Sequence, residues 1–391
     1  MARQHPDPAG FAGAEAELAR HGVTAPRVVV VGGHSAGHIE PAMNLADALR
    51  RLEPTAEITA LGTVRGLDTT LIPARGYPLE LIPPVPLPRT LSPALLQTPG
   101  KLRESVLAAE AVLERVRAEV VVGFGGYVAA PAYLAARRQG LPIVVHEANA
   151  RPGVANRLAA RMTTHVFTAA PGVRLAHATA IGIPLRPAIT GLDRGALRDA
   201  ARRRFGLRPD GPVLMVTGGS QGARTINAAV SDAAPALRAA GIQVLHITGS
   251  QHVVEVPDGD PAEPPYVVTP YVDEMQYAYA AADFVICRSG AMTCAELAAV
   301  GLPAAYVPLP LRGGEQRLNA EPVVGAGGAL LVDDADLDPA WIGTTLIPLL
   351  NDPQQLTAMS ARASAAGAPD ADNVLARHVL TTIADRRSSA S

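Results

Sequence analysis

Short runs of aliphatic residues alternate along the chain with longer stretches in which apolar residues recur at helical spacing. The first run, 27–31, is followed by glycines and by a helical pattern over 41–50. Strands that are apolar throughout are typical of parallel sheets, because helices cover both faces of such a sheet. The first half of the chain therefore predicts a parallel sheet with strands at 27–31, 119–122, 141–146 and 165–169.

The same pattern begins again after residue 210. A strand at 212–217 leads into a glycine loop at 218–223 and a helix over 224–240 that Gly241 ends. Two such units, about half a chain apart, predict an α/β protein with two doubly wound, Rossmann-like domains that face one another. The Gly/Pro segment 182–186 is expected to separate them. Further strands are predicted at 243–248, 283–287, 303–309 and 328–332, and the expected divisions of the chain are 1–26 (an extension), 27–185, 186–365 and 366–391.

The amino-acid composition excludes several classes of protein for this chain. Hydrophobic side chains make up 48% of the 391 residues, which is enough to bury real cores and excludes a disordered chain. With 34 Lys and Arg against 36 Asp and Glu, the formal net charge is -2, and no nucleic-acid partner is expected. Two cysteines, Cys287 and Cys294, are too few for a disulfide scaffold, and no apolar run is long enough for a transmembrane helix.

Two glycine loops stand between a predicted strand and a helix start, at 32–38 and 218–223. Such a loop exposes backbone N–H groups beside the positive end of a helix, which suits phosphate. Neither loop has the spacing of a dinucleotide or Walker A motif. Both match G-x-S-x-G, the nucleophile elbow of hydrolases, with Ser35 in the first. A hydrolase elbow follows several earlier strands and an oxyanion loop, whereas only the short extension 1–26 precedes the strand that leads into this one. Phosphate binding is therefore the preferred interpretation.

His38 stands at the start of the first helix, beside Glu40. The positive helix end favours a neutral imidazole, which can accept a proton, although a capping or packing histidine has the same pattern. His34 lies four residues earlier, so a metal pair is conceivable, but no third ligand is evident and no metal is expected. The acidic segment 258–260 resembles a D-x-D metal motif, and its proline-rich setting favours a surface loop.

Glu296 is the only charged residue between Arg288 and Arg312. A lone carboxylate in an apolar setting is suited to the two hydroxyls of a ribose, while the alternative is a helix charge that points to solvent. Residues 288–293 lie between a strand end and this helix, where a diphosphate could dock. Residues 314–319 open another helix whose polar side chains would face the same cleft, or would only be ordinary helix N-terminal polarity.

A proline-rich segment after residue 82 combines leucines with basic residues. Apolar side chains rimmed by cations are suited to an anionic membrane surface, and the alternative is a loop folded over the protein's own core. The residues concerned are Leu87, Leu91, Leu95, Leu96, Arg89, Lys101 and Arg103.

Taken together, these segments resemble the MurG family of bacterial glycosyltransferases, and most closely its actinobacterial members. The family adds N-acetylglucosamine (GlcNAc) to lipid I, giving lipid II for peptidoglycan. The resemblance runs from about residue 27 to the C-terminal helices. It is specific because six motifs occur in the family's order: GHIEPA at 37–42, GFGGYV at 123–128, HEAN at 146–149, GGSQGAR at 218–224, CRSGAMT at 287–293 and EQRLNA at 315–320.

The resemblance implies a GT-B fold, with a cleft between the two domains and a C-terminal segment that crosses back to the first. It also implies an inverting, single-displacement transfer from UDP-GlcNAc to the 4-hydroxyl of lipid I, without a cofactor or an essential metal. His38 would be the catalytic base. Implied donor contacts are Arg186, Ser220, Met292 and Thr293 to the diphosphate, Val272 to uracil, Glu296 to the ribose, and Glu315, Gln316 and Asn319 to the sugar. Implied acceptor or cleft residues are Ser35, Ala36, Gly37, Tyr127 and Asn149.

The family's known setting implies a peripheral enzyme on the cytoplasmic face of the cell membrane, with cell-wall synthesis and division proteins as further partners. Two departures from the family's pattern leave alternatives open. Where the first loop usually reads G-G-T-G-G-H, His34 and Ala36 replace glycines and Ser35 replaces threonine, and Glu315 replaces a glutamine that many members carry. A UDP-sugar transferase with a specialised-metabolite acceptor, or a non-catalytic UDP-GlcNAc-binding scaffold, would also suit an altered acceptor loop.

Overall fold

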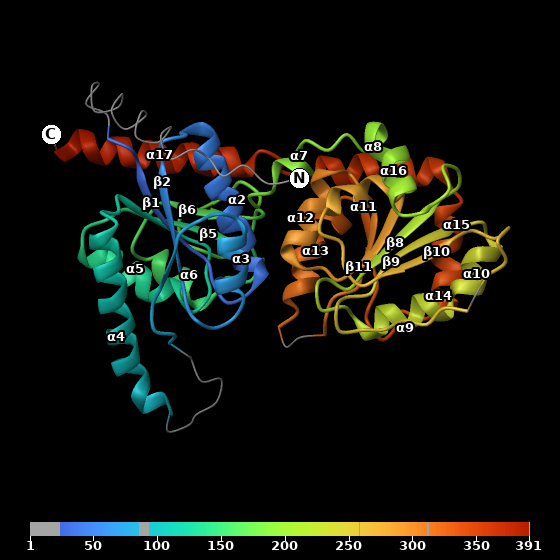
Figure 1. Cartoon of the computed structure of the whole chain (residues 1–391), viewed down its shortest axis with the longest axis horizontal. Coiled ribbons are helices and arrows are strands. Elements are labelled where there is room, and N and C mark those ends of the chain that lie inside the picture. Colours follow the sequence, from blue (N-terminus) through green and yellow to red (C-terminus); the bar gives the residue numbers. More distant parts are fainter. Residues whose placement is uncertain (1–23, 86–93, 258, 311–312, 391) are drawn as a thin grey trace, which may run out of the picture.

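Two parallel sheets, each sandwiched between helices, form two lobes of the computed structural model (Figure 1). The structure describes residues 24–85, 94–257, 259–310 and 313–390. The first sheet has the strand order β3-β2-β1-β4-β5-β6-β7 and the second β10-β9-β8-β11-β12-β13, and neighbouring strands are parallel throughout. These are the two doubly wound sheets expected of a GT-B fold.

The strands of the first sheet are β1 (Arg27–Val31), β2 (Glu57–Gly62), β3 (Leu79–Leu81), β4 (Val120–Gly123), β5 (Ile143–Glu147), β6 (Val166–Thr168) and β7 (Ala178–Ala180). Those of the second are β8 (Val213–Thr217), β9 (Gln243–Ile247), β10 (Tyr266–Thr269), β11 (Phe284–Cys287), β12 (Ala304–Tyr306) and β13 (Ala329–Leu331). The helices of the first half are α2 (Ala36–Leu52), α3 (Asp68–Ala74), α4 (Ala94–Arg115), α5 (Ala129–Arg138), α6 (Val154–Ala159) and α7 (Pro187–Thr190). The remaining helices are α8 (Arg194–Arg204), α9 (Arg224–Asp232), α10 (Ala234–Ala239), α11 (Met275–Ala281), α12 (Ala291–Ala299), α13 (Glu315–Gly325), α14 (Pro339–Trp341), the π-helix η1 (Ile342–Leu346), α15 (Ile347–Leu350), α16 (Pro353–Ala365) and α17 (Ala371–Ala390).

The alternation of side chains along the central strands builds a core on each face of each sheet. In β1, Val28 and Val30 pack with α2 and α17, whereas Val29 and Val31 pack with α4 and α5. In β8, Val213 and Met215 pack with α8, α11 and α12, whereas Leu214 and Val216 pack with α9 and α10. Because both faces are covered, the central strands β1 and β8 are largely apolar, and the parallel sheets predicted from that pattern are confirmed.

Helix α17 belongs by packing to the first lobe, although it follows the second in the chain (Figure 1). Its residues Leu375 and Val379 are fully buried in the core between α2 and the first sheet. Near its end, Arg387 donates two hydrogen bonds of 2.7 Å to the carboxylate of Glu119, beside β4. The last helix therefore ties the end of the chain to the first sheet.

Several boundaries differ from the predicted ones. Helix α2 begins at Ala36 rather than 41, so Gly37 and His38 lie in its first turn, and the expectation that the span from His34 to His38 is loop was wrong for its second half. The predicted helix 224–240 is divided at Ala233, because Pro235 lacks the N–H that would continue the hydrogen-bond ladder. Strands β2, β3, β7 and β10 were not predicted; β2 and β10 contain polar residues, and β3 and β7 have three residues each.

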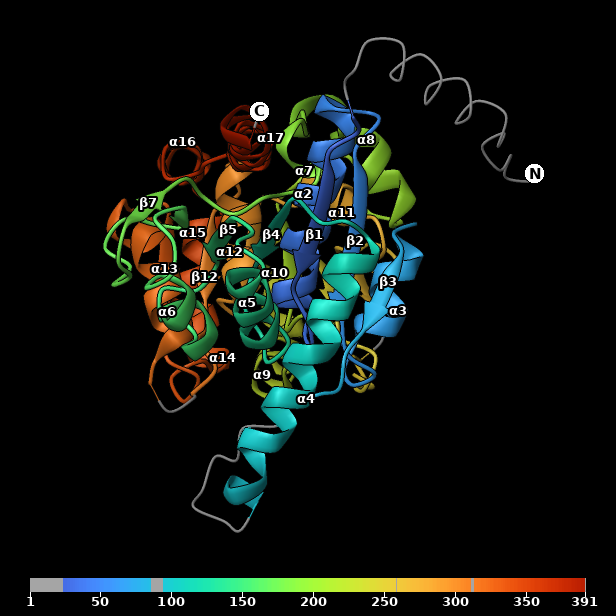
Figure 2. The same cartoon turned by 90° about the vertical axis from the view of Figure 1, so that its left-hand side faces the viewer.

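Helix α4 extends away from the first lobe at its N-terminal end (Figure 2). The segment 86–93, which carries Leu87, Arg89 and Leu91 of the predicted membrane surface, lies outside the described residues, and so do the side chains of Leu95 and Leu96. Of that surface the structure describes Lys101 and Arg103, both exposed on α4. Within the described part of the chain, no helix is long and apolar enough to cross a membrane.

Candidate active site

The first glycine loop follows β1, where the order of the sheet reverses between β1 and β4. It touches a second glycine turn after β4: a Cβ on Gly126 would lie 2.8 Å from the Gly33 carbonyl oxygen, and one on Gly33 would lie 2.7 Å from Val128. Gly125 and Gly126 also have φ of 97° and 83°, which favour glycine. Ligands of open α/β sheets bind in the crevice at such a reversal, so these loops frame a candidate site.

Asp68 fixes the conformation of the first loop. This fully buried carboxylate accepts hydrogen bonds from the His34 N–H (2.6 Å) through Oδ1 and from the Thr63 N–H (2.8 Å) through Oδ2. Sequence analysis missed this residue, whose only signal was an acidic side chain in the first turn of a helix. The His34 N–H is therefore already satisfied, whereas no bond is recorded to the N–H groups of Ala36 and Gly37 among the described residues.

His38 lies in the first turn of α2 and is largely buried beneath the second glycine turn. Its Nδ1 is 3.1 Å from Ser35 Oγ, and a Cβ on Gly125 would lie 3.3 Å from its Nε2. Burial lowers the pKa of His38, and the neighbouring His34 lowers it further, while a backbone hydrogen bond with Gly33 opposes both. The predicted neutral imidazole is thus supported by the direction of this shift.

His34 and Tyr127 form the exposed rim of the same site. Their ring centroids are 6.1 Å apart in an edge-on arrangement. The backbone of His34 has a φ of 76°, in the left-handed region that glycine adopts without strain. The family's glycine at this position is therefore replaced by a residue that keeps a glycine conformation and turns its ring outward.

Glu296, on helix α12, is the carboxylate of the second lobe that the sequence singled out as a ribose ligand. Its Oε2 accepts a hydrogen bond of 2.6 Å from the Tyr279 hydroxyl, a residue that sequence analysis did not single out. Burial raises the pKa of Glu296, while the Tyr279 hydrogen bond and the charge of Arg186 act in the opposite direction. The alternative of a helix charge that points freely to solvent does not fit this environment.

Arg186 links the two lobes beside Glu296. Its Nη2 donates a hydrogen bond of 2.6 Å to Oε2 of Glu40, on α2. Burial disfavours its charge, but the hydrogen bond to Glu40 and the charge of Glu296 together raise the pKa of Arg186. Arg75 donates to the same Glu40 oxygen (2.9 Å), so a chain of charges joins the start of α2 to the start of the second lobe.

Helix α12, which carries Glu296, supplies a further candidate site at its N-terminus. Met292 and Thr293 lie in its first turn, which follows the N-cap residue Gly290, and both are partly exposed. The Ser289 hydroxyl is buried and has no hydrogen-bond partner among the described residues. Arg288 instead faces the interior, where it donates to the Val307 carbonyl (3.1 Å) and pairs with Asp334.

The second glycine loop lies near the C-terminal end of β8 and places Ser220 at the surface. Its geometry is fixed by a neighbouring turn, because Gly222 and Gly249 approach one another closely with φ of 79° and 86°. The Ser250 N–H donates to the Ser220 carbonyl (3.3 Å). Val272 follows β10 and packs partly against the core of the second lobe.

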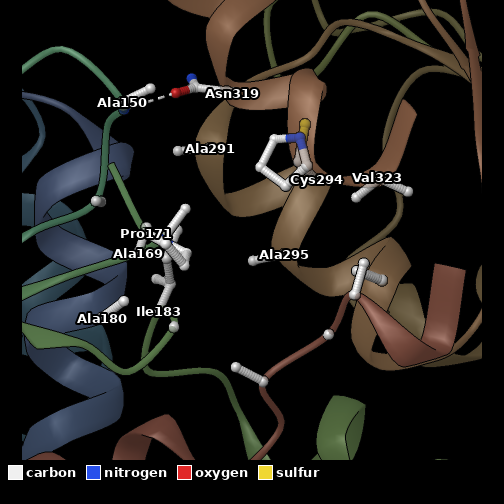
Figure 3. Close-up of a pocket in the computed structure, with 18 of the residues that line it drawn as sticks. Ala150, Ala169, Pro171, Ala180, Ile183, Ala291, Cys294, Ala295, Asn319 and Val323 are labelled. Carbon is white, nitrogen blue, oxygen red and sulfur yellow. Dashed lines mark hydrogen bonds between the residues drawn. The ribbon is translucent and has the colours of Figure 1, made fainter. Parts of the chain in front are cut away.

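Helix α13 faces the first lobe across the cleft. Burial raises the pKa of Glu315 in its first turn, and the nearby Arg151 opposes that shift. Gln316 Oε1 accepts a hydrogen bond from the Leu309 N–H (2.9 Å), which orients its side chain. Asn319 Oδ1 accepts from the Ala150 N–H (2.9 Å), a bond that spans the lobes (Figure 3). Through Asn319, helix α13 therefore contacts the loop that carries Asn149.

A buried network of hydrogen bonds around Glu147 fixes the conformation of that loop. Glu147 Oε1 accepts from the Asn149 N–H (3.0 Å), and its Oε2 accepts from the Gly153 N–H and from Asn156 Nδ2, both at 2.9 Å. Asn156 in turn accepts from the Tyr133 hydroxyl at 2.8 Å. Sequence analysis quoted Glu147 only as part of a motif and missed its partners, because they come from three different elements.

Between the lobes lies a pocket of about 290 Å³ with mostly small apolar walls. Figure 3 shows Ala150, Ala169 and Pro171 on one side and Ala291, Ala295 and Val323 on the other. Among the described residues, no three His, Cys, Asp or Glu side chains are grouped so that they could hold a metal ion. His34 and His38 thus gain no third ligand from that part of the chain, and Asp258 lies outside it.

Comparison with known proteins covers nearly the whole chain. Residues 28–168 match the glycosyltransferase family 28 N-terminal domain and residues 213–375 match the corresponding C-terminal domain. The chain is 58% identical to the UDP-N-acetylglucosamine--N-acetylmuramyl-(pentapeptide) pyrophosphoryl-undecaprenol N-acetylglucosamine transferase of Streptomyces avermitilis, over 92% of this chain and 99% of that protein. The transferase of the same name from Mycolicibacterium smegmatis is 57% identical over 93% and 96% of the two chains.

A solved structure, that of MurG from Acinetobacter baumannii, superimposes with a TM-score of 0.74 at 26% identity, covering 92% of this chain and all of the other. The resemblance inferred from the six motifs, including its actinobacterial character, is confirmed by these matches. The chain belongs to the MurG family of glycosyltransferases.

Proposed function

We propose that this protein is an inverting glycosyltransferase that moves GlcNAc from UDP-GlcNAc to the 4-hydroxyl of the N-acetylmuramyl sugar of lipid I, giving lipid II for peptidoglycan synthesis. The names of relatives 55–58% identical to it support this activity. The observation that carries it is the pairing of two sites across one cleft. Arg186, at the start of the second lobe, bonds to Glu40, two residues after His38, and it is near enough to Glu296 for each charge to shift the pKa of the other.

On the donor side, Glu296 is suited to the ribose, because Tyr279 engages Oε2 and no hydrogen bond is recorded to Oε1 within the described residues. The N–H groups at the start of α12 and the cation of Arg186 are suited to the diphosphate. The proposed donor set also includes Ser220 near the diphosphate and the Val272 backbone near uracil. Glu315, Gln316 and Asn319 would contact the sugar, together with Met292 and Thr293 at the helix start.

On the acceptor side, the first glycine loop is suited to the lipid-linked diphosphate. The N–H groups of Ala36 and Gly37 open helix α2 and have no recorded partner among the described residues, whereas Asp68 already holds that of His34. A helix N-terminus with free N–H groups attracts an anion. Ser35, Tyr127 and Asn149 would line the acceptor cleft beside it.

His38 is suited to the role of general base. Burial keeps its imidazole neutral, so it can take the proton from the acceptor hydroxyl as that oxygen attacks the anomeric carbon. The bond to the UDP oxygen breaks from the opposite side, which inverts an α-linked donor to a β-linked product. Arg186 and the α12 N-terminus stabilise the negative charge that develops on departing UDP.

A lipid-linked acceptor implies that the enzyme works at the cytoplasmic face of the cell membrane as a peripheral protein. Helix α4 extends from the acceptor lobe and exposes Lys101 and Arg103, which are suited to anionic headgroups. We also propose that proteins of cell-wall synthesis and cell division are partners of this enzyme.

Turnover tests the proposed function directly. The protein, UDP-GlcNAc and a short-chain lipid I analogue are incubated in detergent, and UDP and the lipid-linked disaccharide are both quantified. Equal amounts of the two products are expected from the wild type. The Glu104→Gln variant, which changes an exposed carboxylate on α4, is expected to behave alike. Absence of disaccharide from the wild type would overturn the proposal.

A further inference from the structure

A second hollow adjoins the interlobe pocket and has a different chemistry. It is a groove of about 800 Å³. It is bounded by the loop that leads into α6, by the turn after β6 and by the middle of α13, and it shares Ala150, Ala170, Pro171, Leu318 and Pro322 with the apolar pocket. The two hollows therefore adjoin and form one depression. Its first part, the pocket of Figure 3, is lined by apolar side chains, and its second part, the groove, carries the charged ones.

Three arginines and one carboxylate supply the charge of the groove: Arg151, Arg157, Arg174 and Glu321. Arg157 and Arg174 are exposed, and no ion pair or hydrogen bond of their guanidinium groups is recorded among the described residues. Arg151 donates to the Gly313 carbonyl (3.0 Å) across the lobes. The groove thus carries a net positive charge on side chains that can still pair with an anion.

The groove continues directly from the candidate active site. The first turn of α13 carries Glu315 and Gln316 at the proposed sugar site, and the next two turns of the same helix carry Leu318, Glu321 and Pro322 along the groove. On the opposite wall, the groove begins at Ala150, the residue after Asn149, which we assign to the acceptor cleft. The groove therefore shares one helix and one loop with the candidate active site.

We propose that this groove binds the peptide of the acceptor, with peptide carboxylates paired to Arg157 and Arg174. This inference rests on the proposed function, and the relatives' names place a pentapeptide on the muramyl sugar. In that sugar the peptide hangs from the lactyl ether at C3, next to the C4 hydroxyl that accepts GlcNAc. It must therefore leave the cleft close to the reacting oxygen, and five extended residues reach about 17 Å.

The chemistry of a peptide matches the two parts of the depression. A pentapeptide with a free C-terminus carries at least one carboxylate, which a guanidinium binds with paired hydrogen bonds. Small apolar side chains fit the alanine-lined pocket, where the buried thiol of Cys294 forms part of the wall and has its pKa raised to about 12 by burial. The pocket lining offers no charged side chain that would repel them.

The test compares two acceptors that differ only in charge. One short-chain lipid I analogue carries its pentapeptide with free carboxylates, and the other carries the same peptide with every carboxylate amidated. Wild type is compared with the Arg157→Ala/Arg174→Ala double variant and with a control, Arg137→Ala/Arg161→Ala. The control removes two arginines from a different hollow of the first lobe and keeps the same net charge as the double variant.

We expect the double variant to lose about tenfold in kcat/KM on the charged acceptor, mainly through KM. Its kinetics on the amidated acceptor and its KM for UDP-GlcNAc are expected to match wild type, as are all values of the control. An equal loss on both acceptors, or no loss on either, would overturn the assignment of the groove. Wild-type inactivity toward both acceptors would instead refute the proposed function, and the groove's role with it.

Discussion

Glu296→Gln is expected to have opposite effects on donor binding and on stability. The substitution keeps the shape of the side chain and one oxygen for the Tyr279 hydroxyl, whose bond to Oε2 is 2.6 Å long. It removes the charged oxygen that we assign to the ribose hydroxyls. A hydrogen bond to a charged group contributes about 1.5–3 kcal/mol, and its loss weakens UDP binding by roughly 10- to 150-fold.

The empty protein is expected to respond in the other direction. Burial raises the pKa of Glu296 in the folded state, so folding favours its protonated form. The stability that this supplies is present below the unfolded pKa and is lost as the pH rises through the folded pKa. Near neutral pH the carboxylate therefore destabilises the fold, and the uncharged amide should raise Tm.

Two assays measure the pair of effects on the same samples: calorimetric titration with UDP and thermal unfolding from pH 4 to 8. We expect the gain in Tm of Glu296→Gln over wild type to grow with pH, while the Glu104→Gln control changes neither quantity. A variant that binds UDP as tightly as wild type would refute the assignment of Glu296 to the donor. A fall in Tm at neutral pH would refute the reasoning about its buried charge.

The remaining predictions concern the first loop. His38→Ala should lower kcat by about 10²- to 10⁴-fold while calorimetry shows an unchanged Kd for UDP, and a variant that keeps wild-type kcat would exclude the general base. Because burial lowers the pKa of His38, the acidic limb of the wild-type kcat/KM profile should lie below pH 6.5, and a limb above that value would contradict the neutral imidazole. His34→Gly should raise the free energy of unfolding by about 0.5–1 kcal/mol, because φ at this position is 76° and glycine adopts that value without strain. His34→Val should lower the free energy of unfolding, and denaturant titration measures both changes. Asp68→Ala should lower the free energy of unfolding by about 1–3 kcal/mol, because the His34 and Thr63 N–H groups lose their acceptor. The same variant should turn over the acceptor more slowly while its Kd for UDP stays unchanged. Unchanged acceptor kinetics would show that the loop conformation does not depend on Asp68.

The parts of the fold that could be predicted from the sequence are those with a strong local signal. Central strands such as β1 and β8 are continuous aliphatic runs, which follow from burial on two faces, and a glycine loop after each marks where it ends. Edge strands such as β3 and β10 are only partly buried, so their sequence lacks that signal. Helix α2 begins earlier than its apolar pattern because its first turn lies at the cleft rather than in the core.

Sequence analysis identified side chains that face the cleft more readily than those that hold them in place. Glu296 stood out as a lone carboxylate in an apolar segment, yet its partner Tyr279 lies on another helix and had no distinguishing signal. Asp68 and Glu147 likewise act through backbone N–H groups that only the folded loops bring to them. The expected domain limits at 27–185 and 186–365, and the roles of the individual site residues, stay predictions.

The central claim is an inverting transfer to a muramyl acceptor, and the linkage of the product tests it most directly. The disaccharide formed from UDP-GlcNAc and a short-chain lipid I analogue is isolated, and its anomeric proton coupling and linkage position are measured by NMR. The account predicts a single β-1,4 linkage to the muramyl sugar. An α-linkage, attachment at another hydroxyl, or release of UDP with free GlcNAc and no disaccharide would contradict it.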